Sequence, residues 1–305
     1  MVMLMNYRDM ILGIAVGDAM GVPLVGMNRN ELLEHPVTTM LPFLDFGCGV
    51  WSVPTSLALA CGSTISKYGI DSEFLMKSFV DVFEYRYSIQ KDLFPLGKTT
   101  TDAITKYLDG TPIEKCGGIN LNNNGSGSLL MMGPVAYYCY RNKLDSSEVL
   151  KVVRQVSGLT HCHDISIIAC YLYVMYLYYL MVGKDKHVAL ELLSELDLSN
   201  HRNEYVELFD SILKTNLRDV FMDTIKTTGY VVSTLEAALF VFLNSDNYSQ
   251  AILGAINLGG ETSTIASIVG CMASIYYGGD SIPDSWVTKL QGTHLIDANI
   301  DCFEN

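Results

Sequence analysis

The sequence predicts an all-α protein that forms a single compact domain over residues 1–305. Apolar residues recur at the three-and-four spacing of buried helical faces, and no segment of useful length shows the alternation of a strand. Hydrophobic residues make up 49% of the chain, so we expect an extensive core. No internal repeat divides the sequence.

The first half of the chain is expected to contain five helices. The first has small residues along one face, which implies a close neighbour, and it ends before Pro23. A polar loop then extends to about Gly49, and the next helix has Ser52 as a plausible N-cap with Pro54 in its first turn. The five predicted helices cover residues 7–22, 53–65, 71–85, 99–108 and 129–140.

The second half is expected to contain a core helix and several shorter ones. Residues 165–182 carry no charge and are long enough to cross a membrane, but five tyrosines and the soluble character of the other helices favour a central core helix. The remaining helices are predicted over residues 146–157, 188–196, 203–217, 233–244, 249–256, 265–277 and 282–290.

The stretch from Asn257 to Tyr277 combines a turn with a buried helix. Gly259 and Gly260 make a tight turn, Glu261 is the only charged residue that follows, and three hydroxyl residues lead into the apolar helical face. Such a turn delivers oxygen atoms and free N–H groups to a helix N-terminus. It suits phosphates through the N–H groups, or cations through carboxylates.

Charge and cysteine usage restrict the partners and the compartment. The formal net charge is -13, which argues against nucleic acid or an anionic membrane as a partner. The eight cysteines are scattered singly, as expected of reduced thiols, and the N-terminus lacks the pattern of a signal peptide. We therefore expect a cytoplasmic protein that acts on small ligands or proteins.

Two polar segments are further candidates for ligand contact. The loop at residues 120–128 precedes a buried helix, which is the local design of a phosphate or sugar contact, although a surface loop with a helix cap is commoner. His161 and His163 stand two residues apart and have no third ligand at helical spacing, so they are weak as a metal pair. Carboxylates near these turns are not paired in sequence; they are Asp18, Asp45, Asp102, Asp164 and Glu261.

Seven motifs, in order along nearly the entire chain, resemble the ADP-ribosylglycohydrolase family. They are Gly17-Asp-Ala-Met-Gly-Val-Pro23, Gly97-Lys-Thr-Thr-Thr101, Gly125-Ser-Gly-Ser-Leu-Leu-Met-Met-Gly-Pro134, Leu159-Thr-His-Cys-His163, Thr228-Gly-Tyr-Val-Val-Ser-Thr-Leu-Glu-Ala-Ala238, Asn257-Leu-Gly-Gly260 and Tyr277-Gly-Gly-Asp-Ser-Ile-Pro-Asp-Ser-Trp286. The resemblance implies an orthogonally packed all-α fold with a cleft at one end. It also implies hydrolysis of the N- or O-glycosidic bond between ADP-ribose and its acceptor, with two carboxylate-bridged magnesium ions.

The family's metal motifs are degenerate in this chain. The family places five carboxylates in three turns, and only Glu261 keeps a carboxylate here. The seven positions that correspond to the metal site are Val25, Ser52, Val53, Pro54, Glu261, Ser263 and Thr264. In the polar loop, Ser126 and Met131 replace the usual Asn and Arg. We therefore expect no binuclear centre, no catalytic residue and no cofactor.

Other positions keep the family's identities and are candidates for binding ADP-ribose or a related nucleotide. They are Trp51, Thr55, Gly127, Ser128, His161, Gly259, Gly260 and Thr264. These residues also suit a purely structural role in turns, caps and close packing. His161 and Ser128 are the leading candidates for ligand contact.

The resemblance and its departures support one leading hypothesis and two alternatives. The leading hypothesis is a catalytically inactive member that binds ADP-ribose, an ADP-ribosylated protein or a related nucleotide. One alternative is an active hydrolase that works without metal or with a single ion held by Glu261 together with Asp18 or Asp45. The other is an interaction scaffold with a vestigial cleft, for which an exposed apolar patch away from the cleft would be the marker.

Overall fold

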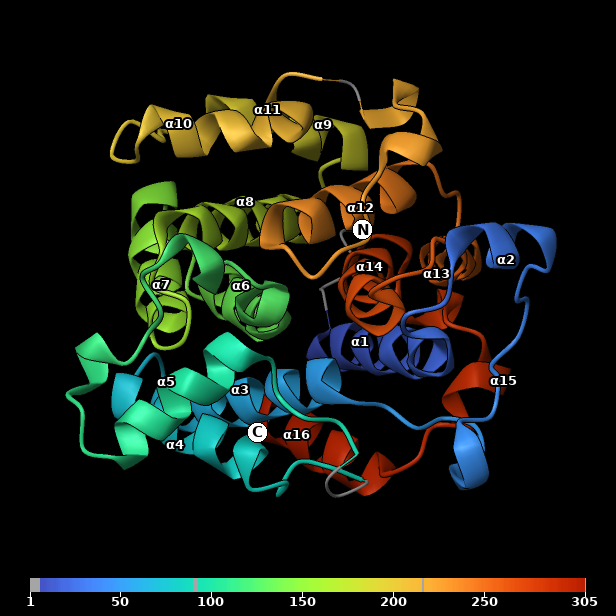
Figure 1. Cartoon of the computed structure of the whole chain (residues 1–305), viewed down its shortest axis with the longest axis horizontal. Helices are drawn as coiled ribbons and strands as arrows, with labels where there is room; N and C mark the ends of the chain where they lie inside the picture. The colour runs from blue at the N-terminus through green and yellow to red at the C-terminus, as the bar shows by residue number, and fades with distance from the viewer. Residues whose placement is uncertain (1–5, 90–92, 216, 305) are drawn as a thin grey trace. The chain divides into compact units, whose positions relative to one another are not determined.

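The computed structural model describes residues 6–89, 93–215 and 217–304, in which α-helices and 3-10 turns are joined by loops (Figure 1). It has no β-strand in these residues; two isolated bridges, Gly118 to His161 and Gly125 to Tyr230, are the only strand-like pairings described. The predicted all-α class is confirmed.

The contacts between Cα atoms divide the chain into two compact units. Unit 1 contains residues 1–55, 216–229 and 233–305, and unit 2 contains residues 56–215 and 230–232. Two helices have residues in both units: α3 (Val53–Tyr68) and α12 (Val231–Leu243). One domain over residues 1–305 stays a prediction, and each unit is described by itself.

The remaining helices of unit 1 come from the two ends of the chain. They are α1 (Tyr7–Gly21), α2 (Arg29–Glu34), α13 (Tyr248–Asn257), α14 (Thr262–Tyr277), α15 (Asp284–Val287) and α16 (Thr293–Glu304). Short 3-10 turns join them: η1 (Val22–Leu24), η2 (Leu44–Phe46), η8 (Leu217–Asp219), η9 (Met222–Thr224) and η10 (Gly279–Ser281).

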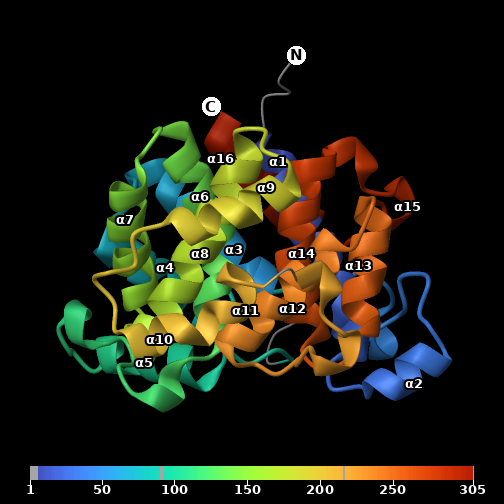
Figure 2. The ribbon, with the colours of Figure 1, turned by 90° about the horizontal axis from the view of Figure 1, so that it is seen from above.

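Glycines allow α1 and α14 to pack closely along their length, as the small residues of α1 predict (Figures 1 and 2). A β-carbon at Gly17 would lie 2.1 Å from the carbonyl oxygen of Ala266, and one at Gly21 would lie 2.5 Å from the Ser263 amide nitrogen. Backbone atoms of one helix therefore occupy the space of a side chain on the other. This packing fixes the start of α14 against the end of α1.

Unit 2 is built around one long buried helix. Apart from α3 and α12, its helices are α4 (Ser72–Phe83), α5 (Lys98–Leu108), α6 (Met132–Arg141), α7 (Ser146–Gly158), α8 (Asp164–Met181), α9 (Lys186–Glu191), α10 (Asn203–Val206) and α11 (Asp210–Leu213). Its 3-10 turns are η3 (Ile113–Lys115), η4 (Leu121–Asn123), η5 (Ser126–Met131), η6 (Leu192–Glu195) and η7 (Glu207–Phe209).

The buried helix is α8, which packs against α6 and α7 (Figure 2). Among the described residues, α8 is the one helix whose length and composition would allow it to span a membrane. However, 83% of its 18 residues are buried inside the protein. The prediction of a core helix at this place in the chain matches that burial.

Several predicted elements differ from the structure. The expected loop before Gly49 contains α2, whose six residues are too short to show a helical period. The helix predicted over residues 203–217 is instead α10, η7 and α11, and residue 216 lies outside the described residues. The short helix predicted to end near Leu290 is α15, and the helix α16 after it was not predicted, although Ile296 and Ile300 are buried at helical spacing.

Candidate functional site

The first turn of α3 is held in place by Asp18 of α1. Both oxygens of the Asp18 carboxylate accept hydrogen bonds: Oδ1 from the Ser52 hydroxyl at 2.7 Å, and Oδ2 from the Ser52 amide at 2.8 Å. Oδ2 also accepts from the Thr55 amide at 3.1 Å and from its hydroxyl at 2.7 Å. Asp18 therefore takes up donors at the start of a helix that lies 34 residues further along the chain.

The Asp18 carboxylate is completely enclosed. Burial raises its pKa from the ordinary 3.8 to about 6, and the hydrogen bonds from Ser52 and Thr55 oppose that rise. An isolated buried carboxylate would be costly, so the donors around Asp18 are what makes its position tolerable. With its acceptor sites used inside the protein, Asp18 is a structural group rather than a free ligand for an ion.

Val53 and Pro54 form the first two positions of α3, where the resemblance expects adjacent aspartates. Neither side chain can ligate a cation. Trp51, just before them, is a core residue with 1% of its surface exposed, and its indole Nε1 donates to the Gln291 carbonyl at 2.7 Å. Thr55 is fully buried, and its hydroxyl donates a hydrogen bond to Asp18. Trp51 and Thr55 thus have structural partners within unit 1.

The turn before α14 is clasped by two other segments of unit 1. The Gly26 amide donates to the Gly260 carbonyl at 2.8 Å, and the Gly260 amide donates to the Met27 carbonyl at 3.0 Å. Gly259 and Gly260 both have positive φ, and a β-carbon at Gly260 would lie 2.3 Å from the Thr227 carbonyl oxygen. The predicted tight turn is present, and its two glycines are required by conformation and close approach.

The side chains that follow this turn are less constrained. Thr262 donates its hydroxyl to the Gly21 carbonyl at 2.7 Å. The Glu261 side chain does not cap α14, and within the described residues the side chains of Glu261, Ser263 and Thr264 make no hydrogen bond or ion pair. Glu261 is half-buried, and its carboxylate lies beside Gly229.

Two further candidate positions for a metal ion, Val25 and Asp45, lie at the surface. Val25 follows η1 and has 52% of its surface exposed. Asp45, offered as a second carboxylate for a single ion, is exposed in η2. Across residues 6–89, 93–215 and 217–304, no group of three or more His, Cys, Asp or Glu residues is placed to hold a metal ion.

The donor set does not fit the two magnesium ions that the family resemblance implies. Magnesium requires several oxygen ligands in an octahedron, preferably carboxylates. Val25, Val53 and Pro54 supply none, and Asp18 already accepts from four donors in the protein. Glu261 would be the sole carboxylate of the motif positions, beside two neutral hydroxyls.

Of the predicted residues of unit 2, Gly127 packs against His161. A β-carbon at Gly127 would lie 3.0 Å from His161 Cε1 and 2.9 Å from the Thr100 hydroxyl oxygen. The Thr160 hydroxyl lies 2.8 Å from His161 Nδ1. Only 2% of the His161 surface is exposed, and burial lowers its pKa to about 4. His161 is therefore a neutral core histidine at pH 7.

Ser128 also lies in the interior of unit 2. It has no exposed surface, and its hydroxyl accepts from the Cys170 thiol at 3.3 Å. Nearby, the Asn124 side-chain carbonyl accepts from the amide and the hydroxyl of Ser166. His163 caps α8, because its Nδ1 accepts from the Ile165 amide at 3.2 Å. His161 and Ser128, the leading candidates for ligand contact, thus have internal partners, while Gly127 is partly exposed.

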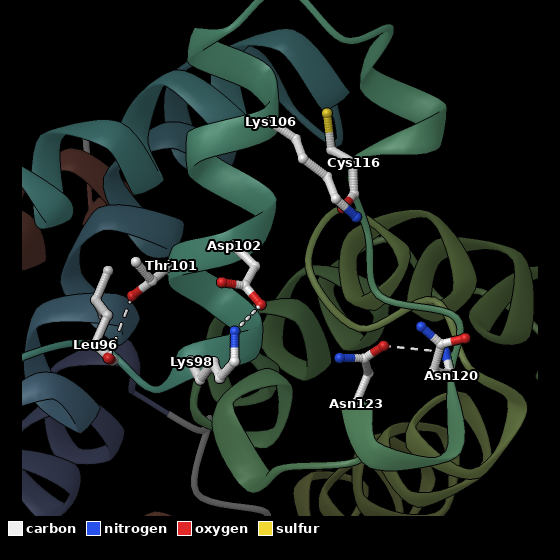
Figure 3. Close-up of polar contacts among 8 residues, drawn as sticks. All are labelled: Leu96, Lys98, Thr101, Asp102, Lys106, Cys116, Asn120 and Asn123. Atoms are coloured by element: carbon white, nitrogen blue, oxygen red, sulfur yellow. Dashed lines mark hydrogen bonds and ion pairs between the residues drawn. The ribbon is translucent and has the colours of Figure 1, made fainter.

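The polar loop at residues 120–128 is organised by its own side chains (Figure 3). The Asn123 side-chain carbonyl accepts from the Asn120 amide at 3.0 Å, closing η4 as a capping box. On α5, the exposed Lys98 pairs with Asp102 at 2.7 Å, and Thr101 donates to the Leu96 carbonyl at 3.3 Å. The loop contains η4 and the start of η5, and its residues Asn124, Ser126 and Ser128 are buried.

Sequence reasoning did not find the clamp made by Arg29. Its guanidinium donates to three backbone carbonyls: Leu258 at 2.9 Å, Met222 at 2.8 Å and Ile225 at 2.6 Å. These partners lie about two hundred residues away, so no local pattern could indicate them. Nor did any local pattern indicate the hydrogen bonds of Asp18, whose partners Ser52 and Thr55 lie 34 and 37 residues away.

Comparisons with known proteins agree with these motifs. A family model described as ADP-ribosylglycohydrolase matches residues 3–304. The chain is 29% identical over 290 residues to ADP-ribosylarginine hydrolase Tri1 of Pseudomonas putida (strain GB-1), covering 93% of this chain and 73% of that protein. It is 23% identical over 286 residues to the ADP-ribosyl-[dinitrogen reductase] glycohydrolase of Rhodospirillum rubrum, covering 92% and 88%.

A solved structure shows the same fold. It is described as an ADP-ribosylglycohydrolase-related protein complex, and it matches with a TM-score of 0.78 at 21% identity over 97% of each chain. At this identity the likeness speaks for the fold alone. Together with the match of the family model over nearly all residues, it shows that the chain belongs to the ADP-ribosylglycohydrolase family.

Proposed function

We propose that this protein is a family member without binuclear magnesium catalysis, and that it binds ADP-ribose, an ADP-ribosylated protein or a related nucleotide. The observation that carries the proposal is the first turn of α3. Val53 and Pro54 occupy the helix start, while Asp18 still holds the neighbouring Ser52 and Thr55 by four hydrogen bonds. The support of the turn is kept, and the ligating groups are missing.

Electrostatics favours the loss of the binuclear centre. Two divalent ions beside Glu261 alone would leave roughly three positive charges uncompensated in a partly dehydrated site, where each unpaired ion costs several kcal/mol. Neutral hydroxyls of Ser263 and Thr264 cannot offset that charge. Substitution of several ligands on an intact scaffold is what we expect of a site that no longer holds metal.

The start of α14 is the part of unit 1 that we propose to contact the ligand. Ser263 and Thr264 each have 8% of their surface exposed, and their hydroxyls are uncommitted among the described residues. Gly260 is also partly exposed, next to Glu261. Hydroxyl groups and backbone at a helix start suit the ribose hydroxyls and phosphate oxygens of ADP-ribose. In unit 2, Gly127 is the corresponding candidate.

Titration calorimetry with ADP-ribose, without and with magnesium, tests binding. We expect heat in both conditions, with the same dissociation constant, because no metal takes part. The double variant Ser263→Ala/Thr264→Val should weaken binding by about tenfold, since it removes two hydroxyls while keeping their size. Thr288→Val, at an exposed threonine of unit 1, is the matched control and should bind normally. No heat at millimolar ADP-ribose would refute the proposal.

The active-hydrolase alternative is favoured by one observation, the half-buried and uncapped carboxylate of Glu261. The two readings predict opposite results for Glu261→Gln. If the protein only binds, the variant retains ADP-ribose affinity, and the wild type releases no ADP-ribose from ADP-ribosylarginine or ADP-ribosylserine substrates. If the protein is a hydrolase that uses Glu261, the wild type releases ADP-ribose and the variant does not.

A further inference from the structure

Unit 1 contains an apolar groove that no part of the proposed nucleotide site uses. We call it the α2–α13 groove; it has a volume of about 380 Å³, and its walls come from α2, the segment after α2, η9 and α13. Leu32, Leu253 and Leu258 are among its lining residues. Figure 1 shows α2 beside α13 at this place, and the two helices are in contact.

The walls of the α2–α13 groove are fixed by hydrogen bonds. The Asn257 side chain accepts from the Val37 amide at 2.8 Å and donates to the Val37 carbonyl at 2.9 Å, which ties the segment after α2 to α13. Arg29 donates to the Met222 carbonyl at 2.8 Å, which ties η9 to α2. A preformed groove lowers the entropy cost of binding.

Large apolar side chains are exposed along the edge of the groove. Leu33 and Met222 line it with 46% and 41% of their surfaces exposed, and Phe221 next to Met222 has 80% exposed. Contiguous exposed apolar surface marks sites of protein association, and methionine is common where a surface adapts to a partner. These side chains suit the apolar face of a partner better than a small polar ligand.

Acidic residues surround this apolar strip. Glu31 and Glu34 are exposed on α2, Asp223 follows Met222, and Asp246 lies beside the lining residue Gln250, whose side chain accepts from the Asp246 amide. The neighbouring cation Arg29 donates hydrogen bonds from its guanidinium to backbone carbonyls and also interacts electrostatically with Asp223, so it offsets part of the charge of that carboxylate. Lys226 and His35 are the other basic side chains in these segments. The net charge of -13 adds to the negative potential.

We propose that the α2–α13 groove docks a basic amphipathic helix of a partner protein. An apolar groove between helices accepts the apolar face of a helix, and the acidic rim complements its basic face. A peptide that binds by strand addition would need a free sheet edge, and no strand exists in the described residues. A second copy of this chain would bring its own negative charge to a negative rim, so it suits the groove less well.

A fluorescein-labelled helical peptide of about 14 residues, built from leucine on one face and lysine on the other, is the probe. Fluorescence anisotropy with the full chain should show binding. Leu33→Lys/Met222→Lys places two charges in the groove and should weaken binding by at least about tenfold. Glu34→Lys/Asp246→Lys should weaken it to a similar extent and reduce its salt dependence.

Matched controls separate the groove from general attraction to an acidic protein. Leu108→Lys changes an exposed leucine of unit 2, and Asp109→Lys/Glu114→Lys changes two exposed carboxylates there. These variants should bind within about twofold of the wild type. A peptide with glutamate in place of lysine should not bind.

Three results would overturn the proposal. The first is no binding of the leucine–lysine peptide by the wild type. The second is equal binding by the groove variants and their controls. The third is self-association in sedimentation velocity that Leu33→Lys/Met222→Lys abolishes, which would assign the groove to a second copy. Unchanged thermal unfolding of the variants shows that each of them is folded.

Discussion

The starts of α3 and α14 are both polar turns in unit 1, but they are bonded in opposite ways. At α3 the hydroxyls and amides of Ser52 and Thr55 all donate to Asp18. At α14 the side chains of Ser263 and Thr264 make no hydrogen bond to the rest of the described chain. At the start of α3 the polar groups of Ser52 and Thr55 are bonded within the protein. At the start of α14 the hydroxyls of Ser263 and Thr264 remain available as donors and acceptors for a ligand.

This difference separates side chains that are bonded within the fold from side chains that are not. Asp18 matches the family motif and stabilises the turn, whereas Val53 and Pro54 stand where the resemblance expects ligands. The Gly259 to Gly260 turn is likewise supported by backbone contacts. Family identities are therefore kept at these supporting positions, while four of the five expected carboxylates are gone.

Removing Asp18 should have the largest effect on stability. Asp18→Ala leaves buried donors of Ser52 and Thr55 without an acceptor and should lower the free energy of unfolding by about 4 kcal/mol. Urea denaturation followed by circular dichroism measures the change. Asp45→Ala, at an exposed carboxylate, should stay within about 0.5 kcal/mol of the wild type. A loss as small for Asp18→Ala would show that the turn is held by other contacts.

Adding a methyl group at the second turn should have the next largest effect. Gly260→Ala combines an unfavourable positive φ with a β-carbon 2.3 Å from the Thr227 carbonyl oxygen, and should cost about 3 kcal/mol. Gly69→Ala has a similar φ and nothing within 4 Å, so it should cost only about 1 kcal/mol. Equal urea midpoints for the two variants would mean that the Thr227 carbonyl can move to make room for a methyl group at residue 260.

The pH dependence of Asp18 should give a smaller change. Its pKa is about 6 in the folded protein and 3.8 ordinarily, so the folded state holds the proton more strongly. The stabilisation is complete below about pH 4 and is lost as the pH rises through 6. Between pH 4.5 and 7.5 the free energy of unfolding of the wild type should therefore fall by about 2 kcal/mol relative to Asp18→Asn, which does not titrate.

Urea denaturation of both proteins at the two pH values isolates this effect, because the other titrating groups cancel in the comparison. A difference between wild type and Asp18→Asn that does not change with pH would contradict the raised pKa of Asp18. A difference that grows in favour of the wild type as the pH rises would reverse the sign of its effect.

Much of the helical fold could be predicted because the long helices carry their own signals. The glycine face of α1 indicated a close neighbour, and the uncharged α8 indicated a core helix. Helix α2 is too short to show a period, and the segment from α10 to α11 is broken by a 3-10 turn that local propensity does not reveal. Two glycines followed by hydroxyl residues indicated the turn at residues 259–264, and the structure contains it.

The bonding of the site could not be predicted from sequence. Ser128 and His161 were the leading candidates for ligand contact, yet both are buried with partners inside unit 2. Burial of a short polar side chain depends on contacts distant in sequence, as the Ser128 bond to Cys170 shows. Arg29 and Asp18 likewise act on segments that no spacing rule connects to them.

Calorimetric titration with magnesium tests the central claim, that the scaffold is kept while the metal ligands are lost. The wild type should give no binding heat, because Glu261 is the one carboxylate left at the metal-motif positions. The variant Val25→Glu/Val53→Asp/Pro54→Asp/Ser263→Asp supplies the missing carboxylates on the same turns and should bind magnesium. Binding of two magnesium ions by the wild type would contradict the account.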